Sequence, residues 1–150
     1  MEMRVCLKNF STLDNSVMDK RLKALCVQLG KMSSELATDW MISTYPVDAM
    51  EWGEALLLIP HRTWKRSDQK RLARYYFCKL PFSGGRGYEV FASIMPLQVL
   101  VACILEHLPT ESSRIELLCY YLVPVLERFA KNESDCQMIV EFVTKLHVKE

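Results

Sequence analysis

The stretch 47-VDAMEWGEALLLIP-60 carries the clearest helix signals in the chain. Asp48 and Glu51 have the spacing of a capping box, in which side-chain oxygens accept hydrogen bonds from the unpaired N–H groups at a helix start. Val47 and Trp52 stand at the two positions of a hydrophobic staple. The sequence therefore predicts a helix from Asp48 to the closing proline, and its four consecutive aliphatic residues predict burial on nearly every side.

Apolar residues on both sides of this stretch recur at intervals of three and four, which is the period of an α-helix. Gly30 stands where a left-handed glycine commonly ends a helix. Pro124 falls inside an apolar pattern, where we expect a kink or a break in the helix. Beside the helix over 48–60, the patterns predict helices over 15–30, 34–44, 67–80, 88–95 and 97–108, and two more that begin at 113 and 134.

These patterns predict an all-α fold of about eight short-to-medium helices, which are antiparallel because two to six residues connect them. Segments ending in proline recur as LLLIP, CKLP and EHLP, and the first and last of these prolines, 60 and 109, lie 49 residues apart. That spacing is near the period of HEAT-type pairs. Two architectures stay open: a HEAT-like stack of helical pairs and a compact helical bundle. Residues 1–150 form one all-helical domain, or a fragment of a longer helical-repeat protein.

Composition places the chain among globular proteins, because 50% of its 150 residues are hydrophobic. The longest apolar run, 99–105, is far shorter than the ~20 residues of a membrane-spanning helix. The six cysteines form no C-x-x-C pair, so they lack zinc-ligand spacing. We expect an intracellular protein of the cytoplasm or nucleus, without a membrane span, metal or cofactor. We also expect buried, reduced thiols at Cys26, Cys78, Cys103 and Cys119.

The sequence offers little for catalysis. Its three histidines, His61, His107 and His147, are widely separated, and neither H-E-x-x-H nor G-x-S-x-G occurs. Glu106 precedes His107, but a histidine at a helix end commonly interacts with the helix dipole instead. We therefore predict that the protein is not an enzyme and has no catalytic residues.

The charge is distributed unevenly, although the whole chain has a net charge of only +1. Between 62 and 79, seven Lys and Arg residues face a single acid, Asp68, which gives this segment a net charge of +6. Another cation, Arg86, follows in the glycine-rich loop 83-SGGRG-87. Cations with aromatic neighbours are typical of phosphate contact with base stacking. The predicted binding residues are Arg62, Lys65, Arg66, Lys70, Arg71, Arg74 and Arg86, with Trp64 and Tyr75 as candidate aromatic contacts.

Two functions from different classes follow from this pattern. The first is a protein–protein interaction or scaffold domain that recognises a partner, such as an acidic protein, through the basic helix or an apolar groove. The alternative is DNA or RNA binding through the basic segment 62–79. A homo-oligomer is a further hypothesis, because eight methionines and the apolar excess could supply a dimer face. Candidate apolar anchors for a partner are Trp40, Trp52, Trp64, Tyr120 and Tyr121.

Overall fold

The computed structural model describes residues 19–149, and within them the chain forms helices joined by turns and loops, with no strand. Eight α-helices and two short 3-10 turns follow one another along the sequence. None of these helices is both long enough and apolar enough to cross a bilayer. The elements are α2 (Lys20–Lys31), α3 (Ser34–Thr44), α4 (Glu54–Leu58), η1 (Ile59–His61), α5 (Arg66–Tyr76), η2 (Phe77–Lys79), α6 (Arg86–Ile94), α7 (Leu97–Leu105), α8 (Ser112–Phe129) and α9 (Glu133–Lys149).

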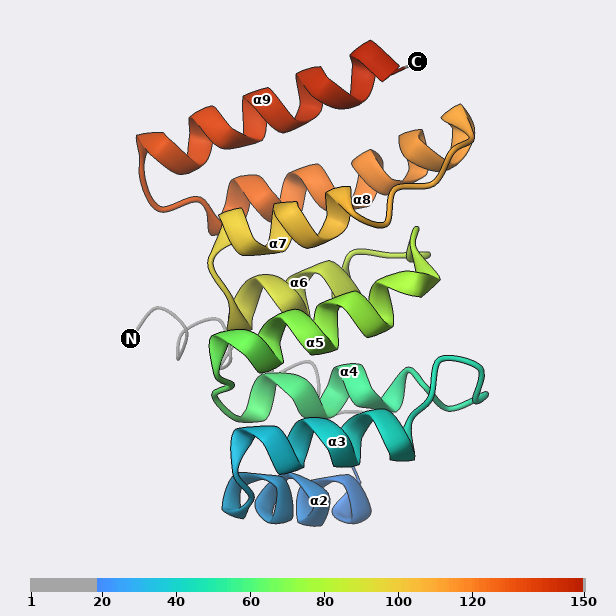
Figure 1. Cartoon of the computed structure of the whole chain (residues 1–150), viewed down its shortest axis with the longest axis vertical. Helices are drawn as coiled ribbons and strands as arrows, with labels where there is room; N and C mark the ends of the chain where they lie inside the picture. The colour runs from blue at the N-terminus through green and yellow to red at the C-terminus, as the bar shows by residue number, and fades with distance from the viewer. Residues whose placement is uncertain (1–18, 150) are drawn as a thin grey trace.

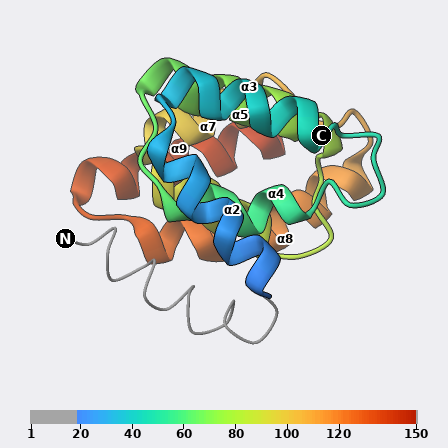
Figure 2. The same cartoon turned by 90° about the horizontal axis from the view of Figure 1, so that it is seen from below.

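The helices form two rows, because helices two apart in the sequence pack side by side. One row contains α3, α5, α7 and α9, and the other contains α2, α4, α6 and α8. Figure 1 shows the chain rising from α2 at one end of the long axis to α9 at the other, and Figure 2 shows the two rows from below. The all-α prediction is confirmed, and within it the order of contacts is that of stacked helical pairs.

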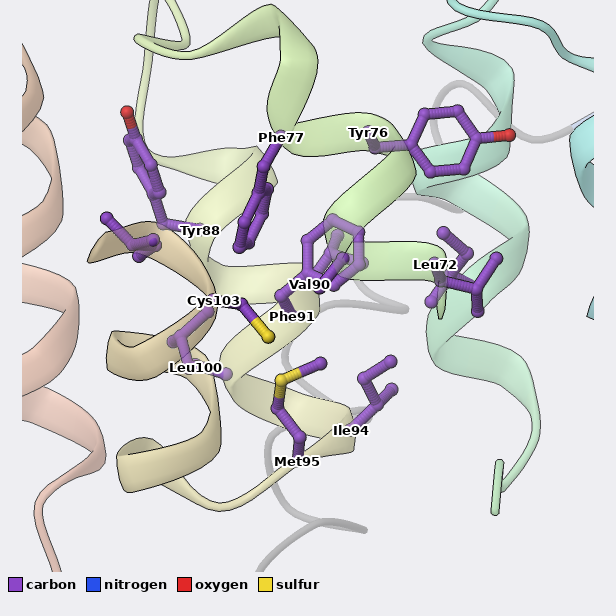
Figure 3. Packing of buried hydrophobic residues seen from close by; sticks show 14 of the residues in the cluster. Leu72, Tyr76, Phe77, Tyr88, Val90, Phe91, Ile94, Met95, Leu100 and Cys103 are labelled. Carbon is purple, nitrogen blue, oxygen red and sulfur yellow. The ribbon is translucent and has the colours of Figure 1, made fainter. Parts of the chain in front are cut away.

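Helix α6 lies at the centre of this stack, and seven of its nine residues are buried. Phe91 is fully buried and meets the ring of Phe77 edge-on, with 4.9 Å between the ring centroids. Leu72 from α5 and Leu100 from α7 are buried in the same core. Figure 3 shows these side chains converging from α5, α6 and α7. One continuous core therefore joins the two rows.

The predicted helix start at Asp48 is wrong, because α4 begins at Glu54. Residues 46–54 instead form successive turns in which an N–H group donates to the carbonyl three residues earlier, as Trp52 donates to Ala49. These turns accompany the stacking of Trp52 on Tyr76, with 6.1 Å between their ring centroids. Tertiary stacking outweighs the local capping signal here. The predicted burial is confirmed for the aliphatic run, in which only Leu57 is partly exposed.

A further expectation about a helix end is wrong, because Gly30 lies inside α2 and none of the described glycines has a positive φ. Helix α8 continues through Pro124, so of the two outcomes expected there the break does not occur, and the kink stays a prediction. The carbonyl group that proline leaves without its helical hydrogen bond belongs to Tyr120, a residue that is 72% exposed. The expected start of the first helix, at residue 15, lies outside the described residues.

The cysteine prediction is confirmed only in part. Cys103 is buried, Cys26 and Cys119 are half-buried, and Cys78 is exposed. All five cysteines among the described residues are free thiols. Cys78 lies in η2 at the surface. The apolar pattern of the sequence does not distinguish buried from exposed positions in this segment.

Two buried tyrosines should make the fold sensitive to alkali. Burial raises the pKa of Tyr88 to about 12 and raises the pKa of Tyr76 as well. An unfolded chain releases these protons near pH 10. Between about pH 10 and 12 the unfolded state therefore binds fewer protons than the folded state, and stability falls as pH rises.

We expect the urea midpoint to fall steadily from about pH 10 to pH 12. The variant Tyr88→Phe should show a shallower fall, because one of these protons is no longer linked to folding. A midpoint that stays constant over this range in the wild-type protein would contradict the prediction.

Candidate partner-binding surface

Arg62 is a structural residue, although the sequence predicted it to bind a partner. Its guanidinium group donates hydrogen bonds to the carbonyl oxygens of Leu29 and Met32, at 2.6 and 3.0 Å, where α2 ends. It also lies 4.8 Å from the ring of Trp64. Burial lowers the pKa of this guanidinium group. Arg62 therefore binds backbone carbonyls at a helix end and is not presented as a free cation.

The two aromatic residues predicted as contacts are also held by the fold. Trp64 is only 5% exposed, and its indole N–H donates to the carbonyl of Ile59 at 2.9 Å. Tyr75 is half-buried, and its hydroxyl accepts a hydrogen bond from the backbone N–H of Val47 at 2.9 Å. The expectation that Trp64 offers a stacking surface is therefore wrong.

Arg71 and Arg74, in the middle and last turn of α5, form ion pairs with the neighbouring helices of their row. Arg71 contacts Asp39 of α3 at 2.6 Å, and Arg74 contacts Glu106, directly after α7, through two hydrogen bonds of 2.9 and 3.2 Å. The bond to Asp39 raises the pKa of Arg71. The bonds between Arg74 and Glu106 raise the pKa of the former and lower that of the latter. These arginines join helices together and are already neutralised.

Asp68, the single acid of the basic segment, is buried at 4% exposure. Its carboxylate accepts a hydrogen bond from the Ser34 hydroxyl at 2.6 Å and contacts Arg71 at 3.3 Å. The same hydroxyl oxygen accepts a hydrogen bond from the backbone N–H of Lys65 at 2.9 Å. This relay ties the start of α3 to the start of α5.

Three of the predicted cations stay together at the start of α5. We call Lys65, Arg66 and Lys70 the N-terminal cationic cluster. Their side chains form no ion pair with any of the residues that the structure describes. Arg66 and Lys70 are one helical turn apart, so they project from the same side of α5. This cluster is the part of the predicted basic helix that the fold leaves available.

The remaining predicted cation, Arg86, lies at the other end of α5, beside a pocket of about 480 Å³. We call this the aromatic pocket. Lys79, which belongs to the basic segment, also lines it, with its amino group 5.3 Å from the ring of Trp52. The full lining is Trp52, Gly53, Leu56, Lys79, Pro81, Phe82, Ser83, Gly84, Arg86 and Gly87.

The aromatic pocket brings together residues that the sequence analysis placed in different categories. Trp52 was expected as an apolar anchor, and Arg86 as a cation in a glycine-rich loop. No local motif joins them, because 34 positions separate residue 52 from residue 86. The signal available in the sequence was weak: cations on either side of a proline–glycine loop, at 79 and 86.

The other candidate apolar anchors differ in how far their side chains are exposed. Trp40 is half-buried and meets the ring of Tyr45 edge-on, at 6.0 Å between centroids. Tyr120 is 72% exposed and meets Tyr121 edge-on at 5.0 Å. Leu117 is exposed one turn earlier on the same face of α8. This face of α8 is the only place among the described helices where two of the five anchors adjoin at the surface.

Histidine and carboxylate groups do not form the pair that the sequence suggested. Glu106 is bonded to Arg74, and a ring nitrogen of His107 lies 3.1 Å from the carbonyl of Cys103. Within the described part of the chain, no three His, Cys, Asp or Glu residues lie where they could hold a metal ion.

No protein-family model, curated protein or solved structure matches the chain.

Proposed function

We propose that this protein is a non-enzymatic interaction domain that binds an acidic segment of a partner protein. The observation that supports the proposal is the separation of the basic segment into two cationic sites. The N-terminal cationic cluster lies at one end of α5, and Lys79 and Arg86 line the aromatic pocket near the other end. An 11-residue helix is about 16 Å long, so a single extended segment of a partner could reach both sites.

The ion pairs of α5 favour a protein partner over nucleic acid. A nucleic-acid backbone presents closely and regularly spaced charges and is matched by a continuous row of cations. Arg71 and Arg74 would supply the middle of that row, but they are paired with Asp39 and Glu106. Two separated cationic sites instead suit a peptide, whose carboxylates are few and placed by sequence.

The alternative, binding of DNA or RNA, is favoured by one specific observation. The three cations of the N-terminal cationic cluster are unpaired among the described residues and lie together at the surface. Such a cluster could contact two or three phosphates. Contacts of this kind give weak binding without sequence specificity, and that binding weakens steeply with salt.

One titration separates the two functions. The protein is titrated into fluorescently labelled probes at about 50 and 200 mM salt. The probes are a glutamate-rich peptide and single-stranded DNA and RNA oligonucleotides. We expect the peptide to bind, and the triple variant Lys65→Glu/Arg66→Glu/Lys70→Glu to weaken that binding at least tenfold at the lower salt concentration.

The control is Lys20→Glu/Lys23→Glu, which reverses two exposed lysines on α2, a helix that contributes no residue to either cationic site. It should leave peptide binding within about twofold of the wild-type value. Circular dichroism shows whether each variant keeps its helical content. Binding of the oligonucleotides without binding of the peptide would overturn the proposal and establish the alternative.

A further inference from the structure

The exposed apolar side chains gather on the helices at the two ends of the stack. Within the described chain, α2 and α3 end the two rows at one end of the long axis, and α8 and α9 end them at the other (Figure 1). Six large apolar side chains are exposed there, and five of them lie on these four helices: Val27, Leu36, Leu117, Tyr120 and Val140. Helices α4 to α7 between them have none. A helical stack needs polar outer faces where it ends, so these side chains indicate faces that further helices cover.

The outer face of α2 is cationic. Lys20, Lys23 and Lys31 are exposed, and they lie on the same side of the helix as Val27, because the intervals between these positions are close to whole turns. The three lysines form no ion pair with any described residue. The helix contains no acidic residue. This face of α2 therefore presents three positive charges around one apolar side chain.

The outer face of α8 is acidic. Glu116 and Glu127 are exposed and lie on the same side of the helix as Tyr120, which stands between them. Neither glutamate forms an ion pair within the described part of the chain. The two arginines of α8 have partners in the fold, since Arg114 donates to a backbone carbonyl at 3.3 Å and Arg128 pairs with a carboxylate of α6 at 3.1 Å. The two glutamates therefore determine the charge of this face.

The charges on the two faces have the same spacing. Lys20 and Lys31 are eleven positions apart, and so are Glu116 and Glu127. Eleven residues make about three turns and about 16 Å of helix, so each lysine can meet one glutamate when the two helices lie side by side. A contact between two α2 faces, or between two α8 faces, would instead bring like charges together. The two faces are therefore complementary to each other and not to themselves.

We infer that this protein associates with itself head to tail: the α2–α3 end of one copy stacks on the α8–α9 end of the next. Lys20 and Lys31 pair with Glu116 and Glu127 across the contact, and the exposed apolar side chains of the four helices pack between the copies. Each helix within one copy packs on the helix two places away, and the second copy continues both rows in the same order. The inference goes beyond the proposed function and does not depend on it.

An interface made of two different faces leaves one face free at each end of the assembly, so the assembly can grow. We expect sedimentation velocity to show an average mass that rises as the protein concentration rises from about 10 to 500 µM, and that passes twice the mass of one chain. The association should weaken between about 50 and 500 mM salt, because exposed charges are screened. An average mass that stays at one chain would overturn the inference. A mass that levels off at two chains would also overturn it, because it indicates a closed dimer.

Two charge-reversal variants test the two faces separately. Lys20→Glu/Lys31→Glu makes the α2 face acidic, and Glu116→Lys/Glu127→Lys makes the α8 face basic. Each variant alone sets like charges against each other, so we expect its self-association to weaken at least tenfold. A mixture of the two variants should restore the association, because the reversed α2 face of one meets the reversed α8 face of the other. All four substitutions in one chain should restore it as well.

The matched control is Lys65→Glu/Arg66→Glu, which reverses two exposed cations on α5, a helix between the two ends of the stack. It should change the self-association by less than twofold, and circular dichroism shows whether each variant keeps its helical content. If either reversal variant associates as the wild type does, the copies meet through other surfaces and the inference is overturned. Failure of the mixture to associate more strongly than its two components would overturn it too.

The variant Tyr120→Ser tests the apolar part of the contact without changing its charge. The Tyr120 side chain is 72% exposed in a single copy, so its removal should leave the fold intact. We expect the self-association to weaken at least threefold, because the side chain packs between the copies. An unchanged association would show that the α8 face lies outside the contact, and would contradict the inference.

Discussion

Replacement of Phe91 by alanine should lower the free energy of unfolding by about 3–5 kcal/mol, which is the usual cost of removing a fully buried phenylalanine side chain. Phe91 has 0% exposure and stands edge-on to Phe77, which also meets Phe82 and His107. Helix α6 packs against both α4 and α8 in its row and against α7 in the other. A cavity at this position removes contacts on several sides at once.

The measurement is a urea or thermal unfolding curve for a graded series. Phe91→Leu keeps most of the apolar volume and should cost clearly less than Phe91→Ala. For a chain of this length, each kcal/mol lowers Tm by about 2–4 °C, so the alanine variant should melt about 6–20 °C below the wild type. Leu36→Ala removes a side chain that is 61% exposed, and we expect a change within about 0.5 kcal/mol. A loss below about 1 kcal/mol for Phe91→Ala would contradict the central place of α6.

The helices could be predicted from the sequence wherever their apolar period was decisive. The helix Ser34–Thr44 has the bounds that the pattern predicted, and its N-cap Ser33 accepts a hydrogen bond from the N–H of Leu36. Both signals are local, so a single sequence contains them. The start of α4 was predicted wrongly because it depends on a contact that is distant in the sequence. Trp52 stacks on Tyr76, which is 24 positions away.

The candidate site could be predicted only as a set of cations. The sequence shows how many Lys and Arg residues the segment holds, but not which of them the fold neutralises. Asp39 and Glu106 lie 32 positions on either side of their partners Arg71 and Arg74. Each pair forms because alternate helices of the sequence adjoin in one row. The register between those helices decides which carboxylate meets which arginine, and the sequence periodicity does not specify that register.

The same limitation applied to Arg62 and to the aromatic pocket. Arg62 donates to backbone carbonyls at the end of α2. Every residue has a backbone carbonyl, so the residue types do not show which one an arginine will bind. The pocket needs Trp52 and Arg86 to meet across two loops. Both features depend on the paths of the loops, which the composition and the helical period of the sequence do not determine.

Replacement of Asp68 by alanine should lower the free energy of unfolding by about 3 kcal/mol, although Asp68 is one residue of a highly polar segment. The Asp68 carboxylate is buried, and it accepts hydrogen bonds from Ser34 at 2.6 Å and Arg71 at 3.3 Å. Removing it leaves the buried Ser34 hydroxyl without its acceptor and breaks the partly buried ion pair. Leaving one member of such a pair unmatched costs about 3–5 kcal/mol when the pair is fully buried, and less here because Arg71 is 42% exposed.

Arg71 provides a matched control, because it contacts two carboxylates that differ mainly in burial. Asp39 lies closer to Arg71 than Asp68 does, at 2.6 Å, but its side chain is 56% exposed. An exposed ion pair contributes about 0–1 kcal/mol, so Asp39→Ala should cost at most about 1 kcal/mol despite the shorter distance. Equal losses in the two variants, measured by urea unfolding in the same buffer, would show that proximity and not burial determines the effect.

A double-mutant cycle with Ser34→Ala then separates the hydrogen bond from the ion pair. If the Ser34 hydroxyl depends on Asp68, the double variant should lose less than the two single variants together, by about 0.5–3 kcal/mol. Asp68→Asn keeps an acceptor for Ser34 and removes only the charge, so it should fall between the wild type and Asp68→Ala. Strict additivity of Ser34→Ala and Asp68→Ala would mean that the hydroxyl and the carboxylate stabilise the fold independently of each other. A coupled result would mean that the one acid of the basic segment holds the start of α5 against the start of α3 through Ser34.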